Sequence, residues 1–335
     1  MEHFTYLRIA GLNIKIKSAS PPEPNEKSDW RYRNFILNQP PKRIDLEFSL
    51  KVKEDYTRYV GDVLFQTVRE RPGLSRKSMA FRRRKMMRER IRQVKNTEQK
   101  KQKEEYLGGE LDWRISRYRG RFLIEGGTSG NFQVFFDKNF KKMDIFIINP
   151  DRWWKLADVF TGFLQLFMIY YLAAKREGLV VHSAAIKDKL KKGKGYLFAG
   201  VSGAGKTTTS KIWDKHAEGI KVLNDDRIII RREGRKFYLY GTPWHGDFSD
   251  YLKTAAQRAT LDKLFFICHG KKNKAKKVAP IEFFNLFFES VFSPFWDKKG
   301  LEFVSEFLTD LISSVPCYKF SFRNNKRIID YVRNV

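Results

Sequence analysis

A glycine-rich stretch in the second half of the chain has the composition and spacing of a phosphate-binding loop. Residues 200–207 have the sequence GVSGAGKT, in which a glycine is followed by four residues and then by Gly-Lys-Thr. In such a loop (the P-loop) the backbone amides curl around phosphate oxygens, the lysine reaches the β and γ phosphates, and the hydroxyl binds Mg²⁺. The residues expected to contact a nucleoside triphosphate are Gly200, Val201, Ser202, Gly203, Ala204, Gly205, Lys206, Thr207 and Thr208.

An acidic pair follows this loop closely. Asp225 and Asp226 lie 19 and 20 residues after Lys206. Two neighbouring carboxylates can divide the work of phosphoryl transfer, because one coordinates Mg²⁺ and the other accepts a proton from an attacking hydroxyl. His182, in the sequence VVHSAA, precedes the loop by one expected hairpin and can reach the same pocket. A turn-capping role for the pair and a structural role for the histidine are the alternatives.

The elements that position these residues follow from the apolar pattern. Residues 179–200 form two short apolar strands joined by a lysine-rich turn, which is typical of a hairpin, and the second strand leads directly into the P-loop. We expect a helix over 207–219 that ends at Gly219. A strand that contains the acidic pair is then expected over 220–234, and a further strand and loop over 235–247.

The pattern of apolar residues in the first half of the chain predicts a sheet followed by one long helix. Apolar alternation predicts strands within 6–16, 43–52, 111–126 and 130–150. Residues 151–178 predict a single helix with Asp151 as its N-cap and Gly178 as its stop. The uncharged part of this helix, 159–174, is shorter than the ~20 residues that span a bilayer, so we expect a buried helix and a cytoplasmic protein without a signal peptide or transmembrane segment.

The charge of the chain is strongly positive. Its 335 residues include 66 Lys and Arg but 38 Asp and Glu, a net charge of +28. Such an excess favours an acidic partner, a polyanion or bound phosphates. A basic insertion at 69–103 is either a solvated helix or disordered segment, or a docking arm for an acidic peptide, nucleic acid or anionic lipid. The lysine runs at 187–194 and 271–277 are expected to be solvated turns.

Two cysteines, Cys268 and Cys317, are too few for a disulfide framework and are not spaced as metal ligands. We expect both to be buried thiols of the core.

Four segments together resemble the HPr kinase/phosphorylase family and its wider kin, the serine kinases that include lasso-peptide precursor kinases. They are VVHSAA, GYLFAGVSGAGKTTTSKIW, VLNDDRIII and YGTPWHGD, in that order. A more distant similarity is to ATP-dependent phosphoenolpyruvate carboxykinase. The resemblance covers 179–250 well and 265–281 and 315–325 more loosely, whereas 1–145 has no match.

We expect an α+β or α/β fold with two parts. The apolar pattern predicts a sheet-rich region, 1–145, that carries the insertion at 69–103, and the resemblance implies an HPr-kinase-like P-loop kinase domain, 146–335, with a mixed sheet. It also implies ATP and Mg²⁺ and transfer of the γ-phosphoryl group to a serine hydroxyl. By position, His182 lies near the transferred phosphate, Lys206 is the loop lysine, Thr207 and Asp225 bind the metal and Asp226 is the likelier proton acceptor of the pair. Asp247 replaces a metal-binding glutamate of HPr kinases.

One departure from the family bears on the substrate. Residues 241–258 replace the glutamate-and-arginine stretch of HPr kinases, which argues against HPr itself and against phosphorolysis. The leading hypothesis is an ATP-dependent kinase for a serine or threonine hydroxyl of an acidic peptide or protein. The alternatives are a small-molecule hydroxyl kinase and a regulatory ATP-binding module that docks on nucleic acid or an anionic membrane. Nucleic acid is less favoured because the basic segment lacks stacking aromatics. The departure gives no basis for carrying over the homo-oligomeric assembly of HPr kinases.

Overall fold

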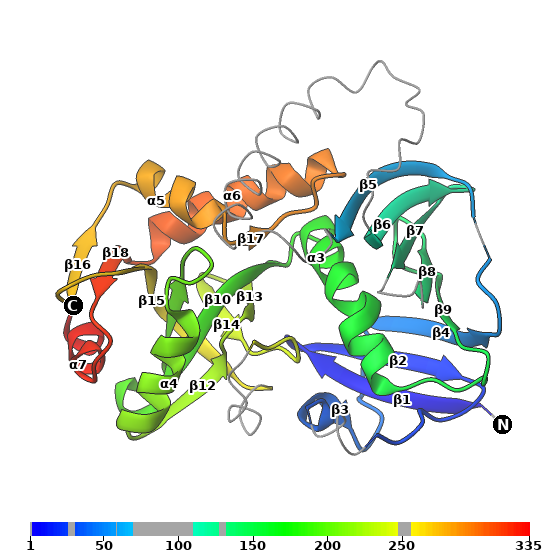
Figure 1. Cartoon of the computed structure of the whole chain (residues 1–335), viewed down its shortest axis with the longest axis horizontal. Coiled ribbons are helices and arrows are strands. Elements are labelled where there is room, and N and C mark those ends of the chain that lie inside the picture. The colour runs from blue at the N-terminus through cyan, green and yellow to red at the C-terminus, as the bar shows by residue number, and fades with distance from the viewer. Residues whose placement is uncertain (1, 26–30, 58, 70–109, 127–131, 247–255) are drawn as a thin grey trace.

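The computed structural model describes residues 2–25, 31–57, 59–69, 110–126, 132–246 and 256–335. Within these residues the chain has mixed α/β content, with two nine-stranded sheets and few helices (Figure 1). The expectation of large mixed sheets is therefore confirmed. Apart from Arg69, the basic insertion predicted at 69–103 lies outside the described residues.

The first sheet, sheet A, is built from the N-terminal half of the chain. Its strand order is β3-β1-β2-β4-β9-β8-β7-β6-β5, with parallel pairing at β2–β4 and β4–β9 and antiparallel pairing elsewhere. The strands are β1 (His3–Ile9), β2 (Leu12–Ser18), β3 (Ile36–Leu37), β4 (Leu46–Lys53), β5 (Asp62–Arg69), β6 (Glu110–Tyr118), β7 (Arg121–Gly126), β8 (Phe132–Phe136) and β9 (Met143–Ile148). A 3₁₀ turn, η1 (Arg33–Phe35), precedes β3. The strands predicted from apolar alternation are thus present, and the expected boundary at 145/146 falls within β9.

The second sheet, sheet B, contains the predicted site. It follows the order β11-β10-β13-β14-β15-β18-β16, and β12 and β17 also pair with β10. The strands are β10 (Gly178–Asp188), β11 (Lys194–Ala199), β12 (Ile220–Asn224), β13 (Arg227–Glu233), β14 (Lys236–Tyr240), β15 (Arg258–His269), β16 (Lys274–Lys277), β17 (Val291–Phe292) and β18 (Cys317–Phe322). Because β11 and β18 run parallel to β15, the carboxyl ends of these three strands meet on one side of the sheet.

The hairpin predicted before the P-loop is confirmed. β10 and β11 pair antiparallel, and a short 3₁₀ turn, η3 (Lys189–Lys191), joins them. In contrast, the lysine run at 271–277 is only partly a turn, because its second half forms β16 and pairs with β18.

The long helix predicted over 151–178 is wrong at both ends. The helical part begins at 156, passes through a π-helical segment, η2 (Asp158–Leu164), and continues as α3 (Gln165–Ala174). Asp151 lies in a turn instead, because the indole of the fully buried Trp154 donates to the Ser20 carbonyl and holds the preceding chain out of the helix. At the other end Arg176 adopts a φ of 57° and terminates the helix before Gly178 opens β10.

The remaining helices cover the two faces of sheet B (Figure 1). They are α4 (Lys206–His216), α5 (Pro280–Phe288), α6 (Lys298–Ser314) and α7 (Arg327–Asn334). α4 lies on one face, while α5 and α6 lie on the other. The helix predicted to end at Gly219 stops at His216, three residues early.

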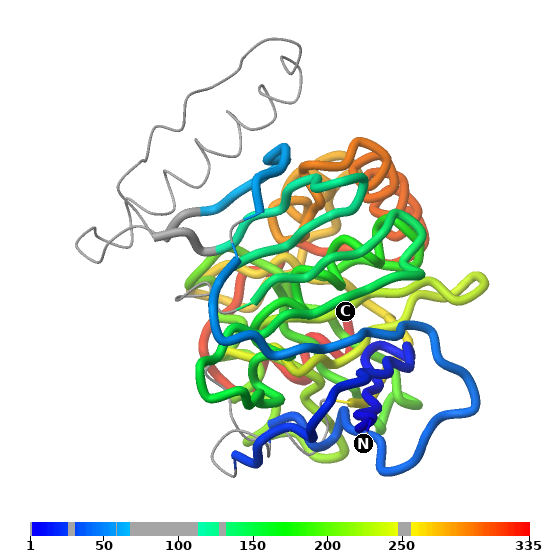
Figure 2. Tube along the Cα trace, turned by 90° about the vertical axis from the view of Figure 1, so that its right-hand side faces the viewer, coloured from blue at the N-terminus to red at the C-terminus, as the bar shows by residue number. Residues whose placement is uncertain are grey.

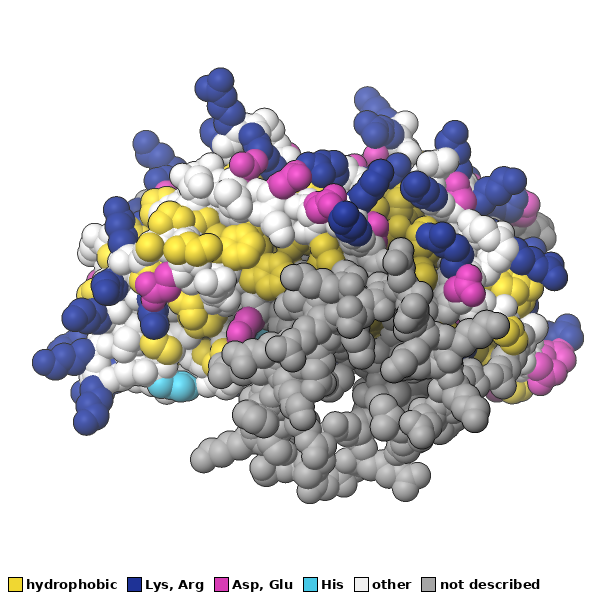
Figure 3. Space-filling model, turned by 90° about the horizontal axis from the view of Figure 1, so that it is seen from above, with side chains coloured by type: hydrophobic (Ala, Val, Ile, Leu, Met, Phe, Trp, Pro, Cys, Tyr) yellow, Lys and Arg dark blue, Asp and Glu magenta, His cyan; other side chains and the backbone are white. Residues whose placement is uncertain are grey.

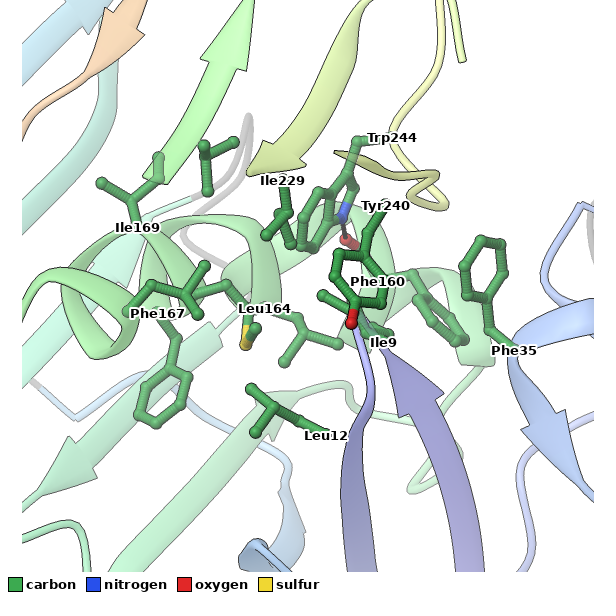
Figure 4. Packing of buried hydrophobic residues seen from close by; sticks show 14 of the residues in the cluster. Ile9, Leu12, Phe35, Phe160, Leu164, Phe167, Ile169, Ile229, Tyr240 and Trp244 are labelled. Carbon is green, nitrogen blue, oxygen red and sulfur yellow. Dashed lines mark hydrogen bonds between the residues drawn. The ribbon is translucent and has the colours of Figure 1, made fainter. Parts of the chain in front are cut away.

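A single large apolar cluster joins the two sheets. Phe160 and Leu164 of η2 pack between Ile9 and Leu12 of sheet A and Ile229 of sheet B (Figure 4). Viewed from the side of sheet A, part of the red C-terminal segment lies behind the strands, and the orange segment before it appears above them (Figure 2). The expected burial of 159–174 is confirmed for most of its residues, and no helix in the described ranges is both long and apolar enough to cross a membrane.

The two cysteines differ in exposure. Cys317 is buried as predicted, and burial raises the pKa of its thiol to about 12. Cys268 is only partly buried, because it lies beside His269 at the exposed end of β15, so this half of the prediction is wrong.

Candidate functional site

The P-loop connects the buried strand β11 to α4. Two of its glycines, Gly203 and Gly205, adopt φ values of 80° and 102°, which other residues rarely tolerate. A Cβ atom at Gly205 would lie 2.7 Å from the Phe322 ring, and one at Gly200 would lie 2.8 Å from the Ile267 carbonyl oxygen. The loop therefore needs its glycines both for its backbone shape and for its close contact with β15 and β18.

Lys206 lies almost buried at the start of α4, with 7% of its surface exposed. Its Nζ donates to the carbonyl oxygens of Gly200 at 3.0 Å and Val201 at 3.3 Å. Burial lowers the pKa of Lys206 to about 8, although the nearby carboxylates of Asp226 and Asp225 oppose this shift. Its ammonium group thus lies within the loop and close to the acidic pair.

Thr207 and Asp225 form a direct hydrogen bond beneath the loop. Thr207 Oγ1 donates to Asp225 Oδ2 at 3.0 Å, and the backbone N–H of Gly246 donates to Asp225 Oδ1 at 2.9 Å. Asp225 is 2% exposed, and a Cβ atom at Gly246 would lie 2.8 Å from its Oδ2. The carboxylate is therefore enclosed between α4 and the loop after β14.

This pair suits a magnesium ion of a nucleotide complex. Mg²⁺ prefers oxygen ligands and takes only one or two protein side chains when phosphates supply the others. A hydroxyl and a carboxylate 3.0 Å apart meet that requirement. Within the described residues, no three His, Cys, Asp or Glu side chains gather as a metal site of their own. Asp247, the third predicted metal ligand, lies outside the described residues.

Asp226 forms a three-membered polar group with His182 and Arg227. His182 Nε2 lies 3.0 Å from Asp226 Oδ1, and the Arg227 guanidinium donates to the same oxygen. The guanidinium also lies over the Phe292 ring, 4.5 Å from its centroid. Within the described residues these contacts all fall on Asp226 Oδ1, so Oδ2 remains for a ligand.

The protonation states follow from these contacts. Burial raises the pKa of Asp226, but the hydrogen bond from His182 and the charges of Arg227 and Lys206 outweigh burial and hold it below its usual range. Burial and the charge of Lys206 lower the pKa of His182, although Asp226 opposes them. At neutral pH the pair is a carboxylate and a neutral imidazole, whose proton we assign to Nε2 from the hydrogen bond. A carboxylate so placed can accept a proton.

The turn that carries the acidic pair is organised by Asn224, which the sequence analysis missed. Its Oδ1 accepts from the backbone N–H groups of Asp226 at 2.8 Å and Arg227 at 3.1 Å. Its Nδ2 donates to the Thr242 carbonyl at 2.9 Å, and the side chain is fully buried. An asparagine before a turn often bonds the backbone two residues on, so the sequence NDD contained this signal.

His269 is a second residue that the sequence analysis missed. Its Nε2 lies 2.7 Å from the carbonyl oxygen of Gly203 in the P-loop. It is the last residue of β15, which pairs in parallel with β11, so its place could be deduced only once that pairing was known.

The structure brings most of the predicted site residues together. The contacts above link His182, Lys206, Thr207, Asp225 and Asp226 at the carboxyl end of β11. The exposed part of the loop comprises Val201, Ser202 and Gly203, whereas Ala204 is buried and Thr208 lies half-buried on α4.

Comparisons with known proteins add no further identification. Searches against protein-family models and against curated proteins find no match to this chain. The similarity to HPr-kinase-like serine kinases therefore rests on the segments quoted above and on nothing else.

Proposed function

We propose that the protein is an ATP-dependent kinase that transfers the γ-phosphoryl group to a serine or threonine hydroxyl of a peptide or protein. The kinase domain would then belong with the HPr-kinase-like serine kinases that the sequence resembles. One observation carries the proposal: Asp226 lies 3.0 Å from His182 beside a P-loop whose Thr207 is bonded to Asp225. Nucleotide binding alone requires the loop, whereas transfer to a hydroxyl also benefits from a carboxylate that accepts the proton.

The proposed roles follow the contacts. Bound ATP would supply the transferable phosphoryl group, and its Mg²⁺ ion would neutralise negative charge on the phosphates. Lys206 and the backbone of the P-loop hold the phosphates, and Thr207 and Asp225 hold the ion. These residues are anchored by β11, α4 and the loop after β14, so the site is largely formed before the ligand arrives.

Asp226 then receives the proton of the acceptor hydroxyl. Its Oδ1 already accepts from His182 and Arg227, so Oδ2 is the oxygen that takes the proton. His182 holds the carboxylate in place, and His182 is itself fixed because its backbone N–H donates to the Ser290 carbonyl at 2.7 Å. Alignment of the hydroxyl with the phosphate is the larger part of catalysis in this reaction class.

A transfer assay tests the proposal. Purified protein, Mg²⁺ and γ-labelled ATP are incubated with a cell extract fractionated by size, and Asp226→Asn serves as the control. Label on a peptide or protein that disappears with the variant supports the proposal. Label confined to small molecules would indicate a small-molecule kinase, and ATP binding without transfer in any fraction would indicate a regulatory module; both contradict the proposal.

A further inference from the structure

The free edge of sheet B next to the P-loop carries a group of basic side chains. β16 ends the order of this sheet and pairs with β18 on one side only (Figure 1). We define the basic edge as the exposed side chains of Lys271, Lys272, Lys274, Lys276 and Arg323. No ion pair is recorded for any of the five within the described part of the chain. Seen from above, Lys and Arg side chains project from this left-hand end of the molecule (Figure 3).

The basic edge begins directly at the P-loop. His269, whose ring contacts the Gly203 carbonyl, is followed by Gly270, and the Gly270 N–H donates to the Phe322 carbonyl at 3.0 Å. The next residue after Phe322 is Arg323, whose N–H donates to Asn273 Oδ1 at 2.9 Å. These bonds hold the loop that bears Lys271 and Lys272 against the end of β18, beside the proposed phosphate site.

At one position the charge of this edge opposes the pairing of β16 with β18. Lys276 of β16 lies directly opposite Lys319 of β18 in the strand register. Like charges in such a position destabilise a sheet. Among the residues that the structure describes, Lys319 has one acidic neighbour, Glu282 at 4.0 Å, and both groups are about half exposed, at 48% and 50%. An anionic partner would remove the repulsion.

Protection against aggregation explains only part of the pattern. Lysines often prevent an edge strand from pairing with other chains, and this role suits Lys274 and Lys276. It does not explain Lys271, Lys272 or Arg323, which lie outside the strand and next to the P-loop. Single-stranded nucleic acid is also a poor fit, because Phe320 and Phe322 are buried and offer no stacking surface.

We propose that the basic edge docks an acidic, extended segment of the acceptor peptide, which adds as a strand to the free side of β16. This inference rests on the proposed kinase function. Strand addition supplies main-chain hydrogen bonds, and alternate side chains of the peptide reach one face of the sheet, where acidic groups meet Lys274 and Lys276. Lys274 pairs with Ser321, at the end of β18 nearest the P-loop, so a serine just beyond the acidic run is directed toward the site.

A binding measurement without ATP tests the docking separately from catalysis. The probe is a fluorescein-labelled ten-residue peptide of alternating Glu and Val with one Ser at its end, and the readout is fluorescence anisotropy at low salt. We expect the triple variant Lys271→Gln/Lys272→Gln/Lys276→Gln to bind at least ~tenfold more weakly than the unmodified protein. The matched control, Lys189→Gln/Lys191→Gln/Lys192→Gln, removes three exposed lysines from the turn of the β10–β11 hairpin, at the end of the hairpin away from the P-loop. It should change the affinity for the peptide less than ~twofold.

Three outcomes would overturn the inference: no binding to the unmodified protein, an equal loss in both variants, or no loss in the first. Further probes test the mode of binding. Two peptides, one with N-methyl groups on every Val and one with N-methyl groups on every Glu, keep the charge but each lack the main-chain donors of one edge of the strand. If both bind as tightly as the parent peptide, strand addition is excluded. A ten-nucleotide single strand that binds as tightly would indicate a general polyanion surface.

A phosphorylation assay with labelled ATP then distinguishes the proposed kinase function from the proposed docking on the basic edge. Binding to the basic edge without phosphorylation of any peptide would contradict the kinase function. Phosphorylation that is equally fast in the triple variant and in its control would contradict the docking alone.

Discussion

Replacement of Asn224 by alanine tests whether one buried amide holds the acidic pair in its working position. The side chain makes three hydrogen bonds to backbone groups, two as acceptor and one as donor. Removal of one partner from a buried hydrogen bond costs ~1–3 kcal/mol, so the three together predict a loss of at least about 3 kcal/mol. This is a large share of the ~5–15 kcal/mol that stabilises an ordinary domain.

The loss is measured as the change in free energy of unfolding by urea, monitored by tryptophan fluorescence. Asn13→Ala is the control, because Asn13 also donates through Nδ2 and accepts through Oδ1, but both bonds are exposed to solvent. We expect it to cost less than ~1 kcal/mol, since water replaces the lost partners. A loss at Asn224 no larger than at Asn13 would refute the argument that burial makes these bonds important.

The same variant should affect the proposed reaction more than nucleotide binding. Within the described residues no hydrogen bond joins Asn224 to the P-loop, whereas Asp226 would lose the bond that fixes its backbone. A displacement of about 1 Å at a reacting group can reduce the rate ~10²-fold, so phosphoryl transfer should fall by about that factor while ATP affinity changes little. Equal losses in transfer and affinity would show that Asn224 supports the whole site and not the acidic pair in particular.

Three further predictions concern the site. Asp226→Asn should retain ATP binding by calorimetry but lose transfer ~10²–10⁴-fold, and an unchanged rate would exclude Asp226 as the base. Lys206 is mostly charged below its pKa of about 8 and mostly neutral above it, so ATP affinity should fall as the pH rises through that value. Lys206→Arg, which stays charged, should abolish this pH dependence. If the arginine variant shows the same pH dependence, another group is responsible. Gly246→Ala should weaken MgATP binding, because the added methyl group would displace the Asp225 carboxylate. The control is Gly234→Ala in the β13–β14 turn, where the positive φ is strained for alanine but the added Cβ meets no atom within 4 Å. Equal affinity of the two variants would argue against a metal-binding role for Asp225.

The sequence predicted those parts of the site that are formed by residues close together in the chain. The glycines of the P-loop, the strand before it and the helix after it are adjacent in the chain, and their pattern was sufficient. The hairpin of β10 and β11 brings His182 back to the P-loop over a short distance, so its place near the loop was also predictable. Its contact with Asp226 depends on the pairing of β10 with β13, which the sequence did not predict.

The missed features depend on contacts between distant segments. His269 meets the P-loop only because β15 pairs in parallel with β11. The helix expected from Asp151 starts late because Trp154 is anchored to Ser20, more than a hundred residues away in the chain. The lysines at 274–277 form a strand rather than a turn because β18 offers them an edge. None of these partners can be identified from the periodicity of one segment.

The hydrogen bond from the Trp244 indole to the Phe160 carbonyl, 2.7 Å long, connects the acidic site to the N-terminal half of the chain. It ties the loop that encloses Asp225 to η2, whose other side packs on sheet A. A gene that encoded only the second half would leave those packing surfaces exposed to water and this loop without its anchor. Substitutions at Ile9 or Leu12 should therefore be tolerated together with compensating changes in η2 and not independently of them.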